Sequence, residues 1–340
     1  MTQWPFVSIV VPVFNGSRTI EDLLRSLVEL DYPSELYEII VVDNHSQDDT
    51  PQKVQQYPVE LLYEHEVQSS YAARNRGVKA AQGDIIALTD ADCVVAPTWL
   101  RHLLADHSNP RWGGFAGGLY PHLPRTCVAR HLAKVGYLAL SSLQQSFFAP
   151  ATIGERLCSW LEVTDYRSEI SLPSNLANPP TANVAYRREV FETIGFFDAR
   201  LTSCGDLDFA WRMQTQTGWQ VKIVPEAAVY HQHRQSLSEM ARLYRKVGWG
   251  YSLVALKYAR NAARVARWMA LENLALIALA IPKNIVVLFT RLLQRPFRCA
   301  DDLYLRSPIF SLVGTVSYYY GRFVGARKGR QWLAEKSSQS

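Results

Sequence analysis

The sequence predicts an α/β protein in which a mostly parallel sheet is covered by helices on both faces. Apolar, β-branched runs alternate at short spacing with helical patterns between residues 7 and 90, as they do in sheets of that kind. Polar side chains stand where three of these runs end, at Asn15, Asp43 and Asp90. Ligands of open α/β sheets bind beyond the carboxyl ends of the strands, so this edge is the expected site.

The individual elements follow from hydrophobic period and turn residues. Apolar runs bounded by turn residues are predicted strands at 7–14, 37–43, 59–64 and 84–90. Three helical patterns lie between these strands. One begins at Ser17, and the others occupy 48–57 and 69–83, of which the last ends at a glycine. Farther along we expect loose helix at 124–170, loop and then strand at 171–191, a helix within 196–218, and a strand, a turn and a short strand at 219–233. After about residue 237 the chain is helical and basic.

Composition bounds the class of protein. The chain has 340 residues, of which 48% are hydrophobic and 20% charged, so it can bury a sizeable core. Its five cysteines are scattered without a CxxC pair, and the N-terminus lacks the basic and then apolar pattern of a signal peptide. We therefore expect a reduced, cytoplasmic protein rather than a disulfide or zinc framework.

Two acids, Asp90 and Asp92, follow the run IIALT with one residue between them. On an extended strand both side chains would point to the same side, and two carboxylates that close repel unless something positive lies beside them. A divalent cation is one solution, because hard cations take carboxylate oxygens as ligands. A solvated loop with two acids is the alternative, and the position at a strand end favours the metal.

A larger set of segments resembles the family 2 glycosyltransferases. In order, they are VVPVFN, VVDNHSQDDT, YAARNRGVKAAQGD, LTDADC, TANVAYRREVFETIGFFDARL, CGDLDFAWRM and AVYHQHR. The resemblance covers about residues 6–235 and implies an inverting GT-A catalytic domain at 1–235. It also implies a nucleotide-sugar donor and a divalent metal, Mn²⁺ or Mg²⁺. Residues 236–340 are then a separate helical, basic region.

The resemblance assigns roles residue by residue. Asp92 matches the metal-holding acid of the D-x-D motif, and His231 is a candidate third metal ligand or phosphate contact. The residues implied to bind the nucleotide are Pro12, Val13, Asn15, Asp43, Arg74 and Asp90, and those implied to bind the substrate are Thr181, Ala182, Asn183 and Arg212. Where the family commonly has V-D-D-G-S, this chain has VDNHS, so Asn44 and His45 leave the base preference open.

The segment Gly205-Asp206-Leu207-Asp208 supplies the candidate general base. In an inverting transfer, a carboxylate removes the proton of the acceptor hydroxyl as that hydroxyl attacks the anomeric carbon. The resemblance places Asp206 at this position, and Asp208 remains an alternative. Either acid could instead complement the dipole at the start of a helix.

Charge and hydropathy set the C-terminal region apart. Residues 257–340 carry 14 Lys or Arg and 4 Asp or Glu, whereas residues 1–256 carry 22 and 27. The basic region indicates an anionic partner, and a membrane surface is favoured over nucleic acid because no nucleic-acid-binding module is recognised. The apolar stretch 266–293 is interrupted by polar residues, and its longest unbroken piece, LALIALAI, has eight residues. We expect interfacial helices on the cytoplasmic face of the membrane, ahead of a helical subdomain packed on the core or spanning helices.

Other classes of protein agree less well with the sequence. A nicotinamide dehydrogenase should have GxGxxG after the first strand, where this chain has VPVFNGSRT, and the glycine-rich loop of a nucleotidyltransferase is also missing. A catalytically degenerate transferase that binds a nucleotide or glycan, or acts in membrane assembly, remains the alternative function. The acceptor, a glycan or a lipid-linked sugar, is left open.

Overall fold

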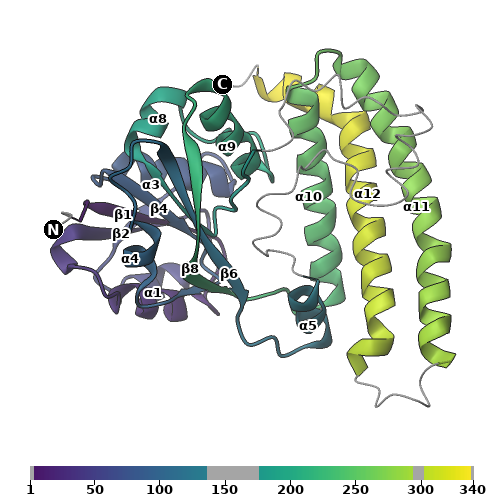
Figure 1. The fold of residues 1–340 in the computed structure, drawn as a ribbon, viewed down its shortest axis with the longest axis horizontal. Coiled ribbons are helices and arrows are strands. Elements are labelled where there is room, and N and C mark those ends of the chain that lie inside the picture. Colours follow the sequence, from purple (N-terminus) through teal and green to yellow (C-terminus); the bar gives the residue numbers. More distant parts are fainter. Residues whose placement is uncertain (1–3, 136–175, 294–301, 338–340) are drawn as a thin grey trace. The chain divides into compact units, whose positions relative to one another are not determined.

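The computed structural model describes residues 4–135, 176–293 and 302–337 (Figure 1). The chain divides into two compact units, and the boundary near the C-terminal end of the sheet falls between Gln232 and His233. The described residues of the first unit, 4–123 and 176–232, contain the sheet. Those of the second unit, 124–135, 233–293 and 302–337, are mostly helical.

The first unit is built on one sheet, whose described strands have the order β3-β2-β1-β4-β7-β6-β8-β5. They are β1 (Val7–Val13), β2 (Tyr37–Asp43), β3 (Glu60–Tyr63), β4 (Ile85–Thr89), β5 (Cys93–Val95), β6 (Trp112–Pro121), β7 (Asn183–Arg187) and β8 (Gln220–His231). Pairing is parallel among β3, β2, β1 and β4 and between β6 and β8. Strand β7 is antiparallel to both its neighbours, and β5 is antiparallel to β8. The predicted α/β class is confirmed.

Helices pack against this sheet through their buried side chains. They are α1 (Ile20–Val28), α2 (Thr50–Val54), α3 (Ser70–Ala80), α4 (Trp99–Leu103), α8 (Arg188–Ile194) and α9 (Gly205–Gln216), with a 3₁₀ turn, η1, at Ser34–Leu36. In α1 the buried residues Ile20, Leu23, Leu24 and Leu27 recur at helical spacing. In α3, Gly77 lets the helix approach the sheet closely, since a Cβ there would lie 2.5 Å from Val10 Cγ1.

Register places the strand ends of the first unit at one edge. Val13 of β1 pairs with Asp43 of β2, and Asp43 pairs in turn with Tyr63 of β3. Leu88 of β4 pairs with Val10 of β1, so Asp90 follows at nearly the same level. The sequence prediction that Asn15, Asp43 and Asp90 emerge at a common edge therefore agrees with the topology.

Several elements differ from the sequence prediction. Strands β5 and β6 and helix α4 were not predicted, and the helix predicted for 69–83 ends at Ala80. The strand, turn and strand predicted for 219–233 is a single strand, β8, because a register shift opposite Gly117 and Gly118 absorbs the extra residues around Pro225. Of the helix predicted for 124–170, α5 (Cys127–Lys134) is observed, and residues 136–170 lie outside the described residues.

The second unit consists of α5 and three long helices, α10 (Leu237–Lys257), α11 (Ala262–Leu293) and α12 (Asp302–Ser337). Figure 1 shows the three long helices side by side, with α12 between α10 and α11. Helix α11 continues through Pro282, and its segment Ala262–Thr290 is long and apolar enough to cross a membrane. Only 17% of its most apolar window is buried. The exposed apolar side chains of α11 are Leu271, Leu274, Leu279, Ile281, Ile285, Val286 and Phe289.

A buried ion pair joins α11 to α12 inside this unit. Arg322 Nη2 lies 3.2 Å from Glu272 Oε2, and both residues are almost fully buried. The Arg322 guanidinium also lies over the ring of Tyr251 in α10, 4.5 Å from its centroid, so one side chain connects all three helices.

Candidate active site

Asp90 and Asp92 lie in the turn that connects β4 to β5. The Cys93 N–H donates to the Asp90 carbonyl at 3.0 Å, which closes this turn. The premise that both acids lie on an extended strand was therefore wrong. Each carboxylate instead has its own partner, and a different element of the fold supplies each of these partners.

Asp90 is paired with an arginine from α3. Arg74 Nη2 lies 2.5 Å from Asp90 Oδ1, and Arg74 is buried while Asp90 is partly exposed. The guanidinium also lies over the Tyr71 ring, 5.4 Å from its centroid. Arg74 was a nucleotide-binding candidate, and the structure places its charge directly against the first acid of the D-x-D motif.

Asp92 lies beside His231. Antiparallel pairing of Cys93 with His231 aligns β5 with β8, and the Gln232 N–H donates to the Asp92 carbonyl at 2.9 Å. As a result, His231 Nε2 lies 3.4 Å from Asp92 Oδ1. The residues 92 and 231, far apart in the sequence, thus meet because two short strand segments pair.

This pair can hold a divalent cation. Ligand atoms of Asp92, Cys93 and His231 all lie within 4.8 Å of one another. Burial raises the pKa of the Cys93 thiol well above its ordinary value, and the charges of Asp92 and Asp90 raise it further, so the sulfur keeps its proton. A carboxylate oxygen and an imidazole nitrogen are both ligands of Mn²⁺, which makes Asp92 and His231 the fitting donors.

Asp43 is a buried acid with an open oxygen. It is 2% exposed, and its Oδ2 accepts a hydrogen bond from the Ser46 N–H at 3.0 Å. Its Oδ1 is also buried and has no hydrogen-bond partner among the described residues. Buried polar atoms are nearly always paired, so this oxygen is suited to accept a hydrogen bond from a ligand.

The residues after Asp43 differ from the common family motif, and they stabilise the loop through their own contacts. Asn44 Nδ2 donates to the Glu64 carbonyl at 3.2 Å and to the Val67 carbonyl at 2.9 Å. His45 has a positive φ of 67°, a conformation that favours glycine, and its ring lies 4.8 Å from that of His65. The stacked Tyr63 ring, 5.5 Å from His65, completes an aromatic group beside Asp43.

The first loop supports that segment from the other side. Pro12 and Val13 are buried at the end of β1, and Asn15 has a φ of 49°. The Asn15 N–H donates to Ser46 Oγ at 2.8 Å, and Asn15 Oδ1 accepts from the Gln47 N–H at 2.7 Å. Asn15 thus ties the loops after β1 and β2 together at the sheet edge.

Asp206, at the start of α9, contacts a tyrosine from α3. Tyr71 Oη donates to Asp206 Oδ1 at 3.4 Å and accepts from the Gly205 N–H at 2.9 Å. Burial raises the pKa of Asp206, and the charge of Asp90 adds to this, while the Leu207 N–H and Arg74 oppose it. Burial also keeps Tyr71 neutral by raising its pKa well above the ordinary value, so the phenol remains a donor.

Asp208, two residues later, has a different environment. It is fully buried, and its Oδ2 accepts from Arg212 Nε at 3.0 Å. The remaining Arg212 nitrogens donate to the carbonyls of Ile194 and Phe196 at 2.6 and 2.7 Å. The Asp208–Arg212 pair therefore binds α9 to the end of α8.

The segment of three implied substrate-binding residues, Thr181, Ala182 and Asn183, contributes to the packing of the first unit. Asn183 Oδ1 accepts from Trp99 Nε1 at 2.8 Å, and its Nδ2 donates to the carbonyls of Gly118 and Ala227. These bonds join α4, β6, β7 and β8. Thr181 and Ala182, which precede β7, are buried.

Sequence reasoning missed Tyr71, which joins Asp206 to the Arg74–Asp90 pair. A signal was present, since Tyr71 and Arg74 stand three residues apart on a predicted helix and therefore share a face. The partner, Asp206, is 135 residues away and could not be assigned from local spacing.

These features define an α/β fold with an acidic site at the carboxyl edge of its sheet. A family model described as glycosyl transferase family 2 matches residues 8–195. The chain belongs to this family, and it is a glycosyltransferase with the GT-A fold.

Individual relatives agree with this assignment. The chain is 30% identical to glycosyltransferase AglE of Haloferax volcanii over 254 residues, which cover 72% of this chain and 73% of AglE. It is 25% identical over 313 residues to the pre-mycofactocin glycosyltransferase of Mycobacterium tuberculosis, covering 88% of this chain but 59% of that protein.

A solved structure has the same fold over most of the chain. The mannosyltransferase PcManGT from Pyrobaculum calidifontis, solved with GDP-Man and Mn²⁺, superposes with a TM-score of 0.58 at 18% identity. The match covers 93% of this chain and 88% of that one.

Proposed function

We propose that this glycosyltransferase moves a sugar, with inversion, from a nucleoside-diphosphate sugar to a hydroxyl of a glycan or lipid-linked acceptor. The observation that carries the proposal is the grouping of Asp90, Asp92, His231 and Asp206 with Arg74 at the carboxyl edge of the sheet. Residues 1–235 would form the catalytic domain, and residues 236–340 a basic helical region.

Asp92 and His231 would hold a divalent cation, Mn²⁺ or Mg²⁺. The bound cation supplies charge neutralisation for the departing diphosphate. Asp90 would face the ribose, and Arg74 would fix the orientation of Asp90 through their ion pair. The open Asp43 Oδ1 would accept a hydrogen bond from the nucleobase, with Pro12, Val13 and Asn15 shaping the loop beside it.

Asp206 is the proposed general base. The acceptor oxygen forms a bond to the anomeric carbon while the bond from that carbon to the diphosphate oxygen breaks. The nucleoside diphosphate leaves with the electron pair, and the acceptor proton moves to Asp206, whose Oδ1 is already hydrogen-bonded to Tyr71 and Leu207. Its raised pKa makes Asp206 a better proton acceptor than an ordinary aspartate.

Asp208 is assigned a structural role in this proposal because Arg212 occupies it. Arg212 in turn holds Asp208 and two carbonyl groups, which makes it part of the frame rather than a substrate contact. One wall of the donor-sugar site would be formed by the backbone of Thr181, Ala182 and Asn183.

The test is the release of nucleoside diphosphate from a panel of UDP-, GDP- and dTDP-sugars with Mn²⁺, Mg²⁺ or EDTA. Wild type is compared with Asp92→Asn and with Asp22→Asn, an exposed acid on α1 that serves as a charge-matched control. Metal-dependent turnover of one donor, lost in Asp92→Asn and kept in the control, supports the proposal. Donor binding without turnover, indifferent to EDTA, would contradict it and favour a non-catalytic binding role.

We also propose that the second unit lies on the cytoplasmic surface of an anionic membrane. The excess of Lys and Arg over residues 257–340 and the exposed apolar side chains of α11 support this. Flotation of the full chain with phosphatidylglycerol vesicles at low salt tests it, and a chain that stays unbound would contradict it.

A further inference from the structure

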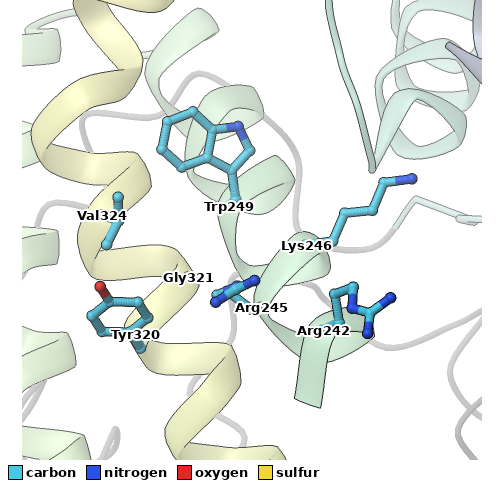
Figure 2. A pocket seen from close by; sticks show the side chains of 7 residues that line it. All are labelled: Arg242, Arg245, Lys246, Trp249, Tyr320, Gly321 and Val324. Atoms are coloured by element: carbon cyan, nitrogen blue, oxygen red, sulfur yellow. The ribbon is translucent and has the colours of Figure 1, made fainter. Parts of the chain in front are cut away.

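A pocket of about 470 Å³ lies between α10 and α12 in the second unit. Its lining comes from one face of each helix: Arg242, Arg245, Lys246 and Trp249 from α10, and Tyr320, Gly321 and Val324 from α12. Figure 2 shows Trp249 and Arg245 of α10 on the side that faces Tyr320 and Val324 of α12, with the Arg242 and Lys246 side chains extending away from α12 in this view. The charge of this region is evident from the amino-acid sequence, whereas the pocket becomes evident only when α10 and α12 are packed together.

Close packing of the two helices forms the floor of the pocket. A Cβ at Gly321 would lie 2.1 Å from the Arg245 carbonyl oxygen, so only glycine allows this approach. A Cβ at Gly248, one turn along, would meet the Tyr318 carbonyl oxygen at the same distance. Small residues at such a crossing bring backbones together, and the long side chains are left at the rim.

The rim of the pocket is cationic. Arg242, Arg245 and Lys246 are exposed, and Arg242 lies three and four residues before the other two, so its charge is close to theirs on α10 and repels them. Arg242 and Arg245 make no ion pair or hydrogen bond with any residue that the structure describes. The one acid of α10, Glu239, is used in the capping box with Ser236.

The remaining lining is aromatic or apolar. Tyr320 is half-exposed at the rim, Trp249 is partly buried, and Val324 contributes a branched aliphatic surface. Tyr and Trp with neighbouring Arg and Lys are typical of the interface between headgroups and acyl chains. A soluble anion would use the cations alone, whereas a lipid would use both kinds of lining.

We propose that this pocket binds the phosphate headgroup of an anionic lipid, with the guanidinium groups on the phosphate oxygens and the lipid's apolar part against Val324 and Tyr320. Arginine suits this ligand because its planar, charged donors match phosphate oxygens. The inference rests on the proposed membrane association but does not depend on the transferase chemistry.

The experiment uses the full chain and vesicles of phosphatidylcholine alone or with phosphatidic acid. The variant Arg242→Gln/Arg245→Gln removes charge from the pocket. Arg260→Gln/Arg264→Gln removes the same charge from exposed positions of the same unit outside it. Because the pocket pair would lose charge-assisted hydrogen bonds to the bound phosphate, it should bind about 30-fold more weakly. The control pair should lose at least 10-fold less than the pocket pair.

A second variant, Val324→Trp, fills the pocket and keeps every charge. It should also weaken binding to phosphatidic acid vesicles, with an unchanged thermal transition showing that the unit is folded. Equal losses of vesicle binding in the two arginine double variants, or full binding by Val324→Trp, would contradict the proposed lipid site. Either result would indicate a diffuse basic surface. Millimolar inorganic pyrophosphate is compared with the lipid as a ligand of the pocket. If pyrophosphate abolishes vesicle binding completely and phosphatidic acid binds no more tightly than pyrophosphate, a free phosphate compound is the ligand instead.

Donor turnover, measured on the same preparations, separates this inference from the proposed transferase function. Turnover without headgroup-specific binding would reject the pocket alone. Pocket-dependent vesicle binding by a chain that turns over no donor would reject the transferase proposal alone.

Discussion

The carboxyl edge of the sheet and the centre of the helical unit both contain buried charged side chains. The two regions differ in how completely these side chains are paired. In the helical unit, Glu272 and Arg322 are closed on each other, and Arg322 is further surrounded by tyrosine rings. At the sheet edge, Asp43 keeps a buried oxygen that has no partner among the described residues, and Asp90 remains partly exposed beside Arg74. A charged side chain that still has an atom available to a ligand is typical of a binding site. A charged side chain that is fully enclosed and paired by the protein holds helices in place.

The same contrast recurs within one turn of α9. Asp208 is fully buried and is bonded to Arg212, which also holds the end of α8. Asp206 accepts hydrogen bonds from the Tyr71 hydroxyl and the Leu207 N–H, and burial raises its pKa. Two acids with nearly the same place in the sequence therefore have different environments.

The largest expected effect comes from removing the charge of Asp206. Asp206→Asn should lower donor-to-acceptor turnover by about 10² to 10⁴, the usual contribution of a general base. Donor binding should be retained, because Asp206 does not contact the metal pair. Steady-state kinetics and donor titration measure the two quantities, and a variant that keeps more than a tenth of the wild-type rate would remove Asp206 from the mechanism.

The pH dependence of the wild type follows from the raised pKa of Asp206. The base is active as a carboxylate, so the rate should fall as pH decreases through a pKa above the ordinary aspartate value of about 3.9. A raised folded-state pKa also means that this group stabilises the fold at low pH and that the stabilisation is lost as pH rises through that pKa. At neutral pH, Asp206→Asn should therefore melt no lower than wild type.

The second expected effect is on stability and lies in the helical unit. Arg322→Met leaves the Glu272 carboxylate buried without its partner and should lower the free energy of unfolding by about 3–5 kcal/mol. The double variant Glu272→Gln/Arg322→Met should recover much of this loss, since no buried charge remains. Urea unfolding of wild type, the single variants Arg322→Met and Glu272→Gln, and the double variant checks the cycle, and additive losses would mean that the ion pair is not the coupling element.

The smallest expected effect tests the positioning role of Tyr71. Tyr71→Phe removes one hydrogen bond to Asp206, which at 3.4 Å should be worth about 1 kcal/mol, or about a 5-fold lower kcat with little change in KM. Loss of this donor should also move the acidic limb of the pH profile to higher pH. Tyr37→Phe, which removes a hydroxyl bonded to the Leu27 carbonyl elsewhere in the first unit, is the matched control. An unshifted pH profile would make Tyr71 a packing residue only.

The sequence was sufficient for the part of the fold that depends on local pattern. Strands such as Val7–Val13 and Tyr37–Asp43 are uninterrupted apolar runs, and their ends predicted the edge at which Asp43 and Asp90 lie. Strand β6 was missed because its run, WGGFAGGLYP, is rich in glycine, which strand propensity disfavours. The glycines are needed there, since a Cβ at Gly117 would lie 2.2 Å from the Ala227 carbonyl oxygen.

The site was less predictable because its contacts are long-range. The pairing of Cys93 with His231 brings Asp92 to the imidazole, and no local pattern encodes it. The separate environments of Asp206 and Asp208 likewise depend on α3 and α8. The family resemblance supplied the residues, and the folded contacts supply the reasons for distinguishing their roles.

The most direct test of the proposed chemistry is Mn²⁺ binding followed by electron paramagnetic resonance, with and without UDP or GDP. We expect wild type to bind Mn²⁺ more tightly when the nucleotide is present. Asp92→Asn and His231→Ala should each weaken this binding at least 10-fold, while Asp22→Asn should leave it unchanged. Equal Mn²⁺ affinity in wild type and Asp92→Asn would contradict a metal site at the turn between β4 and β5.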